Sequence, residues 1–286
     1  METSANVQAL VDHAVQKTLA AFAGQQLKAE EIAVTLLDLR EPGEIRAGAY
    51  RGEARIYPAS VIKLFYLVAA HRWMAEGKIQ DTPELRRAMR DMIVDSYNEA
   101  THCVVDVITD TTSGPELPAA RMAEWENQRN AINRYFTTQG YTNINANQKP
   151  WCEGPYGRER VFVGEHYTNR NALTTDATAR LLAEIALGRA VSPERCTRML
   201  ELLRRDPSGQ STDPDDQAHG FSGPAIPAGA KLWSKAGWTS ETRHDAAYIE
   251  LPGGAKFVLV TFTINHANER GIIPSVARSI FSELEK

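Results

Sequence analysis

The sequence predicts a mixed α/β (α+β) fold, in which an antiparallel sheet flanked by helices is built from both ends of the chain. Two observations carry this prediction. Strand-like apolar segments occur near the start of the chain and again near its end, whereas helical periodicity fills the middle. We therefore expect a discontinuous α/β subdomain over 1–58 and 207–286, an all-helical subdomain over 59–206, and an active site in the cleft between them.

The expected elements follow from periodicity and turn residues. Helical spacing of apolar residues predicts helices over 4–23, 59–75, 83–94, 99–109, 117–139, 175–187, 193–205 and 274–284. Apolar, partly β-branched runs predict strands over 32–39, 45–50, 230–237, 245–251 and 256–264, and Pro252-Gly253-Gly254 is expected to close a hairpin between the last two. The polar segments 140–171 and 206–229 are expected to be long loops.

Composition excludes several classes of protein. The 286 residues carry 32 basic and 36 acidic side chains, a formal net charge of -4, so nothing favours nucleic acid or an anionic membrane as a partner. The longest apolar runs, 64–70 and 258–262, are too short to span a bilayer. Residues 1–16 lack the pattern of a secretory signal. We expect a monomer that is cytoplasmic, or periplasmic or secreted if a signal was removed.

Metal and cofactor chemistry is not predicted. Cys103, Cys152 and Cys196 are widely spaced, and the seven histidines form no HxH or HExxH pattern. One disulfide among the three cysteines is possible, although structural thiols are favoured. No phosphate-binding or dinucleotide-binding glycine motif is present, so the expectation is no cofactor and no metal.

Ser60 and Lys63 open the apolar helix 59–75 and lie one turn apart. A serine hydroxyl needs a base to become a nucleophile, and burial among apolar neighbours would lower the pKa of the lysine amine enough for that role. The alternative is that Ser60 caps the helix and Lys63 extends its amine to solvent. By itself the spacing leaves both interpretations open.

Two further motifs follow in the chain. Ser96-Tyr97-Asn98 lies between two predicted helices, where Ser96 could relay a proton and Asn98 could hold a substrate carbonyl; the alternative is a capping box of Ser96 with Glu99. Lys235-Ala236-Gly237 ends a predicted strand. Lys235 offers a positive charge to a carboxylate, and Gly237 leaves room for a substrate; the alternative is an ordinary strand end.

Together and in this order, the three motifs resemble those of the penicillin-recognising serine acyl hydrolases, which include class A β-lactamases and D,D-peptidases. That family has SxxK, then SxN, then K-[ST]-G on a strand. Two shorter segments also resemble class A enzymes: Ile226-Pro227-Ala228-Gly229 before the Lys235 strand, and Thr174-Thr175 at the start of a helix. The resemblance covers about residues 5 to 284.

The resemblance implies a reaction and the residues that perform it. A β-lactam, or a related small amide or ester, would be opened through an acyl-enzyme on Ser60, with Lys63 as base. Ser96 would pass the proton to the leaving nitrogen, and Asn98 would hold the substrate amide. Lys235 would anchor a carboxylate.

The same resemblance implies an oxyanion hole made by the backbone N–H groups of Ser60 and Trp238. Two departures bear on it. Ala236 replaces the usual hydroxyl residue, for which Thr239 or Ser240 could substitute. The deacylating glutamate of class A enzymes has its nearest match in Glu165, which is either that base or a surface charge; Glu159 is a weaker candidate. These departures keep two rivals open: a D,D-peptidase or esterase with weak β-lactam activity, and a penicillin-binding sensor that acylates once.

Overall fold

The structure is a computed structural model that describes residues 2–41, 43–151 and 154–284. The chain divides into two compact units, one formed by Met1–Val61 with Thr174–Lys286 and the other by Ile62–Leu173. The sequence placed residues 174–206 with the helices of the middle segment. In the structure they belong with the sheet, because the helix that begins at Thr175 packs on strands of the first unit.

The first unit is built on one sheet. Its strands, among the described residues, lie in the order β1-β3-β2-β7-β6-β5-β4. Their bounds are β1 Glu2–Thr3, β2 Ile32–Asp38, β3 Arg46–Tyr50, β4 Arg204–Arg205, β5 Lys231–Trp238, β6 Thr242–Glu250 and β7 Lys256–Ile264. All neighbours are antiparallel except β1, which pairs with β3 in parallel. The expected antiparallel sheet is therefore present, with two short edge strands that the sequence pattern missed.

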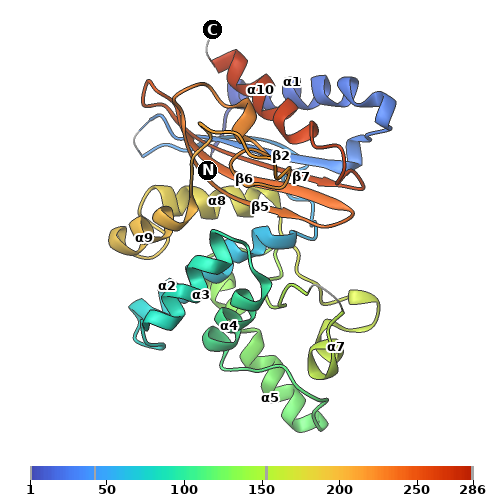
Figure 1. The fold of residues 1–286 in the computed structure, drawn as a ribbon, viewed down its shortest axis with the longest axis vertical. Coiled ribbons are helices and arrows are strands. Elements are labelled where there is room, and N and C mark those ends of the chain that lie inside the picture. Colours follow the sequence, from blue (N-terminus) through green and yellow to red (C-terminus); the bar gives the residue numbers. More distant parts are fainter. Residues whose placement is uncertain (1, 42, 152–153, 285–286) are drawn as a thin grey trace. The chain divides into compact units, whose positions relative to one another are not determined.

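Helices cover both faces of this sheet (Figure 1). Helices α1 (Ala5–Ala21) and α10 (Ile272–Leu284) pack on one face, and α8 (Thr175–Ala186) lies on the other, followed by α9 (Pro193–Leu203). All seven residues of β2 are buried for this reason. Val34 and Leu36 join the apolar core under α1, whereas the alternate residue Thr35 donates its hydroxyl to Asp176 at the start of α8, at 2.6 Å.

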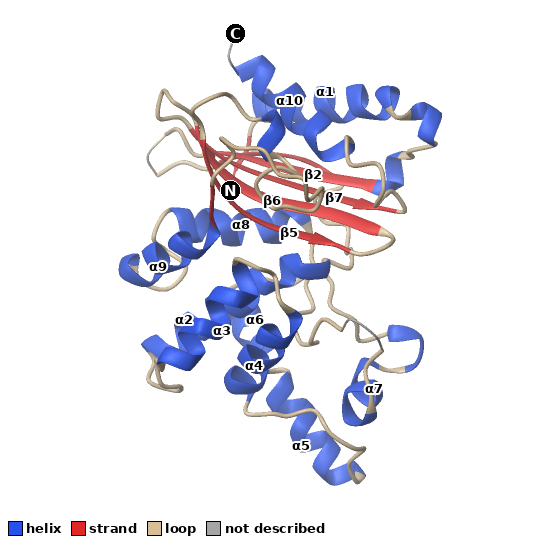
Figure 2. Ribbon diagram, viewed as in Figure 1, coloured by secondary structure: helices blue, strands red, loops and turns tan. Residues whose placement is uncertain are grey.

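The second unit is helical (Figure 2). Its helices are α2 (Lys63–Ala75), α3 (Pro83–Ile93), α4 (Asn98–Thr109), α5 (Ala119–Arg129), α6 (Ala131–Thr138) and α7 (Gly157–Val163). Every residue of α2 except Arg72 and Ala75 is buried, so α2 is the central helix of this unit. The single helix expected over 117–139 is two helices that meet at Asn130, and the loop expected over 140–171 contains α7.

Buried charges fix the segment that precedes and includes α7. Both carboxylate oxygens of Glu159 accept hydrogen bonds from the Arg129 guanidinium at 2.8 Å, and Lys149 donates to Asp106 at 2.8 Å. Burial alone would raise the pKa of the Glu159 carboxyl, but the hydrogen bonds from Arg129 hold that pKa below its ordinary value. Glu159 is therefore an ionised structural partner of Arg129.

No helix among the described residues is long and apolar enough to cross a membrane. Cys103, which is exposed, and Cys196, which is buried, are both free thiols. The two are therefore not joined by the disulfide that the sequence left open. Cys152 lies outside the described residues.

Candidate active site

Ser60 lies in a 3-10 turn, Ala59–Ile62, that leads directly into α2. The preceding residue, Ala59, has a φ of 46°, a left-handed conformation that side chains rarely adopt. Such strain persists only where the surrounding structure enforces it, and it is concentrated at functional sites. The backbone around Ser60 is thus held in a special conformation, and the side chain itself is only partly buried.

Strand β5 passes very close to this turn at Gly237. A Cβ atom at position 237 would lie 2.7 Å from the carbonyl oxygen of Pro58 and 2.8 Å from the amide nitrogen of Ser60. Only glycine permits this approach. Trp238, the next residue of β5, therefore lies in a segment that packs against the Ser60 turn. The backbone N–H groups of Ser60 and Trp238 could form a shared oxyanion hole only if these two segments are close.

His244 supports the same turn from β6, where it pairs with Gly237. Its ring nitrogen Nε2 lies 2.9 Å from the carbonyl oxygen of Tyr57, and Nδ1 accepts a hydrogen bond from the backbone N–H of Thr263 at 3.2 Å. Full burial lowers the pKa of His244 to about 4. The ring is therefore neutral, with its proton on Nε2, and it ties the segment before Ser60 to the sheet.

Lys63, Ser96 and Asn98 come together in the second unit. The Nζ atom of Lys63, which is fully buried, donates to the backbone oxygen of Ser96 at 2.6 Å, to its Oγ at 3.2 Å, and to Oδ1 of Asn98 at 2.9 Å. Lys63 does not extend to solvent, so that alternative is wrong. The first two motifs of the sequence are joined through one amine.

The local backbone explains how Ser96 reaches that amine. Ser96 has a φ of 58°, and α4 begins after it, with Tyr97 at the N-cap position and no side-chain capping bond. The capping box of Ser96 with Glu99 is therefore not formed. Ser96 instead directs its backbone oxygen and its hydroxyl oxygen to Lys63. After Ala59, it is the second residue at the predicted site with a left-handed backbone conformation.

The third motif lies on β5. Lys235 is fully buried, and its Nζ donates to Oε1 of Gln217 and to the carbonyl oxygen of Ala236, each at 2.8 Å. Thr239, considered above as a substitute for the missing hydroxyl, accepts hydrogen bonds from Glu241 and Thr242 in the β5–β6 turn. Its role in substrate binding stays a prediction. Gln217 was not singled out from the sequence, because a glutamine inside a long polar loop carries no recognisable signal.

The two glutamates considered as deacylating bases differ in their exposure and in their partners. The Glu165 side chain is 87% exposed and lies 3.5 Å from His166, as the surface alternative expects. Glu159 is buried and bound to Arg129, as described above. The role of Glu165 stays untested, whereas Glu159 has a structural function that accounts for its burial.

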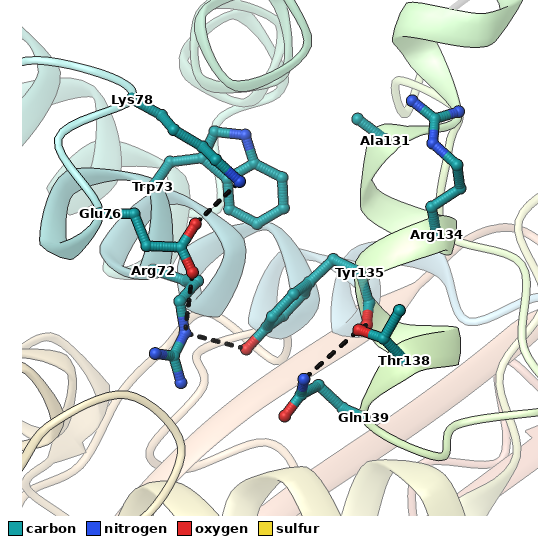
Figure 3. A pocket seen from close by; sticks show the side chains of 9 residues that line it. All are labelled: Arg72, Trp73, Glu76, Lys78, Ala131, Arg134, Tyr135, Thr138 and Gln139. Atoms are coloured by element: carbon teal, nitrogen blue, oxygen red, sulfur yellow. Dashed lines mark hydrogen bonds and ion pairs between the residues drawn. The ribbon is translucent and has the colours of Figure 1, made fainter.

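Two hollows are described in the second unit. The larger, of about 730 Å³, lies beside the end of α2 and along α6 (Figure 3). It is lined by Arg72, Trp73, Glu76, Lys78, Ala131, Arg134, Tyr135, Thr138 and Gln139, none of which belongs to the predicted site. The smaller, of about 270 Å³, includes Tyr97 of the second motif. Among the described residues no group of three or more His, Cys, Asp or Glu side chains could hold a metal ion.

Comparison with known proteins agrees with the family resemblance of the three motifs. The model of the beta-lactamase enzyme family matches residues 14–284. A search of the curated proteins returned no match. Among solved structures, a beta-lactamase from Sphaerobacter thermophilus is similar, with a TM-score of 0.67 and 20% sequence identity over 96% of this chain and 97% of that chain.

PBP-A is similar to the same degree. Its TM-score is 0.65 at 18% identity, over 99% of this chain and 97% of that chain. A mutant of PBP-A, solved as an acyl-enzyme complex with penicillin G, has a TM-score of 0.66 at 17% identity over 99% of this chain and 98% of that chain. These likenesses confirm the expected fold.

Proposed function

Because the chain belongs to the beta-lactamase enzyme family, we propose that it opens a β-lactam or a related small amide through an ester formed on Ser60. The observation that carries this proposal is the cluster of buried Lys63 with half-buried Ser96 and Asn98, which joins two motifs through one amine. Lys63 brings the hydroxyl of Ser96 and the side-chain amide of Asn98 to the start of the helix that follows Ser60. The contact between Nζ of Lys63 and Oγ of Ser96 is a path by which a proton can pass between the two motifs.

In the proposed reaction, Lys63 first gives one of its three ammonium protons to solvent. The Ser60 hydroxyl then attacks the carbonyl carbon and gives its proton to the resulting amine, three residues further along the same helical segment. The C–N bond of the amide then breaks, and Ser96 gives its proton to the leaving nitrogen. Lys63 returns a proton to Ser96 through the 3.2 Å contact. Water finally cleaves the ester and regenerates Ser60.

The first unit would stabilise the charge that develops on the carbonyl oxygen. The N–H groups of Ser60 and Trp238 are the proposed donors, and the close approach at Gly237 supports this pairing. Fixed backbone donors of this kind typically contribute about 3–4 kcal/mol each to lowering the barrier. Lys235 would bind the carboxylate of the substrate, and Asn98 its amide.

A second candidate is a penicillin-binding D,D-peptidase or esterase that forms the same ester but releases it slowly. The binding of Glu159 to Arg129 favours it, because that carboxylate is then not available to activate water. A sensor that acylates once is the limiting case of the same behaviour. The difference between these functions is the rate of deacylation.

The experiment is intact-protein mass spectrometry over time, with penicillin G and a chromogenic cephalosporin, on the wild type and on Ser60→Ala. A mass increase that requires Ser60 and disappears within seconds, with product formed, supports a β-lactamase. A stable Ser60 adduct supports the penicillin-binding candidate. If Ser60→Ala acquires the same adduct as the wild type, Ser60 is not the nucleophile and the proposal fails.

A further inference from the structure

The larger hollow of the second unit lies at the far end of α2 from the predicted site. Its volume of about 730 Å³ is within the range of pockets that hold small organic molecules. Helix α2 begins at Lys63, whereas the hollow lies beside Trp73, ten residues later and about 15 Å further along the helix axis. A ligand in this hollow would therefore not contact the amine that joins the first two motifs.

Two aromatic rings form one wall of the hollow. The ring of Trp73 is buried and the ring of Tyr135, on α6, is half-buried. Their centroids are 5.2 Å apart and their planes meet at 79°, so each ring holds the other in place edge to face. Figure 3 shows Ala131 of α6 across the hollow from Trp73. The small side chain of Ala131 leaves room there for a flat ring to pack against the aromatic wall.

The charge of the lining is positive. Among the described residues that line the hollow, Arg72, Lys78 and Arg134 are basic and Glu76 is acidic, so their formal charges sum to +2. Nζ of Lys78 lies 2.8 Å from the Glu76 carboxylate and 5.2 Å from the centre of the Trp73 ring. Nε of Arg72 lies 4.0 Å from the same carboxylate. The carboxylate of Glu76 is thus shared between two cations (Figure 3).

Arg134 is fixed by neutral partners. Its Nη1 donates to the backbone oxygen and the side-chain oxygen of Asn127, at 2.6 and 3.0 Å. These bonds hold the guanidinium without neutralising its charge. Figure 3 shows Arg134 on the opposite side of the hollow from Lys78. Because a guanidinium matches the planar geometry of a carboxylate, Arg134 favours a ligand with that group.

The end of α2 does not oppose an anion beside it. The last carbonyl groups of a helix carry partial negative charge when they lack partners. Here the carbonyl oxygen of Arg72 accepts a hydrogen bond from the backbone N–H of Glu76 at 2.9 Å. The carbonyl oxygen of Trp73 accepts one from the backbone N–H of Lys78, also at 2.9 Å. These carbonyl groups are therefore satisfied within the chain.

We propose that the hollow between the end of α2 and α6 is a binding site for a small aromatic carboxylate. The ring of the ligand packs against Trp73 and Tyr135, and its carboxylate groups bind Arg134 and Lys78. No bond is made or broken in this step. The inference goes beyond the proposed function and does not depend on it, since none of these residues takes part in the proposed reaction.

The experiment is calorimetric titration of the whole chain with three probes that share one ring. Isophthalate carries two negative charges, 3-carbamoylbenzoate carries one, and isophthalamide carries none. We expect affinity to fall in that order, by at least about tenfold from the first to the last, and to fall for isophthalate as NaCl is raised from about 20 to about 300 mM. No binding of isophthalate, or equal affinity for the three probes, overturns the proposal.

Substitutions of opposite sign locate the ligand. Arg134→Gln should weaken isophthalate binding by at least about fivefold, because it removes a charge-assisted contact. Glu76→Gln should strengthen binding by about threefold, because it removes the carboxylate that faces the ligand. Arg121→Gln, at an exposed arginine of α5 outside the hollow, is the matched control and should change nothing. The same affinity in all three variants places the ligand elsewhere and overturns the proposal.

A steric variant tests the hollow itself. Ala131→Trp should fill the space and abolish binding, whereas Ala119→Trp, at an exposed alanine of α5, should not. Thermal unfolding shows whether each variant is folded, and the charge variants decide the question if Ala131→Trp is not. Ser60→Ala should bind isophthalate as the wild type does, so a failure of the proposed acyl-enzyme leaves this test unaffected. Unchanged binding by folded Ala131→Trp overturns the site.

Discussion

His244 makes the stability of the first unit depend on pH. Burial lowers the pKa of its imidazole to about 4, whereas the same group in an unfolded chain titrates near 6.5. Between these two values the unfolded state binds a proton that the folded state does not. Acid therefore favours unfolding in that window, and the stability present above pH 6.5 is lost as the pH falls toward 4.

The size of this loss follows from the difference between the two pKa values. Each pKa unit corresponds to about 1.4 kcal/mol, so the full effect is about 3 kcal/mol, and about 2.5 kcal/mol of it falls between pH 7.5 and 4.5. This is a large fraction of the stability of a typical protein. Protonation of Nδ1 also removes the acceptor for the Thr263 N–H. Because the same ring bonds the carbonyl oxygen of Tyr57, this change disturbs the support of the Ser60 turn.

The assay is urea unfolding at pH 7.5, 6.5, 5.5 and 4.5, for the wild type and His244→Gln. Glutamine has a donor and an acceptor but does not titrate, so the variant keeps every other source of pH dependence. We expect the wild type to lose about 2.5 kcal/mol more than the variant between the two extremes. His13→Gln, an exposed histidine of α1, is the control and should behave as the wild type. Parallel pH profiles for wild type and His244→Gln would refute the reasoning.

Three further predictions concern the site and its support. Lys63→Met should remain folded and lose acylation by roughly 10²- to 10⁴-fold, measured by the rate of adduct formation, and an unchanged rate rules out the proposed base. Gly237→Ala should slow acylation at least about tenfold, because its Cβ would meet backbone atoms beside the nucleophile at 2.7 Å; Gly253→Ala, which meets no atom within 4 Å, should not. Glu159→Gln should lower the free energy of unfolding by about 3–5 kcal/mol, because it removes the nearer and better buried of the two carboxylates that face buried Arg129. Glu165→Gln should leave stability within error, and equal effects of the two variants would contradict the structural role.

Local patterns were sufficient to predict most of the elements. The alternating residues of β6 and β7 and the turn Pro252-Gly253-Gly254 predicted a hairpin that the structure contains, with Leu251 N–H bonded to Ala255. The helix over 117–139 was wrong as a single element. No proline or glycine marks the break at Asn130, and the new direction of α6 depends on packing that local propensity does not encode.

The predicted site was harder to derive, because its contacts join distant segments. The S-x-x-E pattern at Ser96 predicted a capping box, yet tertiary contact with Lys63 holds Ser96 in a left-handed conformation instead. Burial of Lys63 was one of the two interpretations that its apolar neighbours left open, and the structure decides between them. Gln217 had no recognisable sequence pattern, because its hydrogen bonds with Lys235 and Ala236 depend on how a long polar loop folds beside β5.

The strand order of the sheet determines when each pair of strands can form during synthesis. Its central strands β2 and β7 pair residue Ile32 with Thr263, which are separated by most of the chain. Residues 62–173 lie between them and form a unit with its own contacts. On a ribosome this middle segment emerges before β7, so the edge of β2 that does not pair with β3 stays open until residues 256–264 have been made.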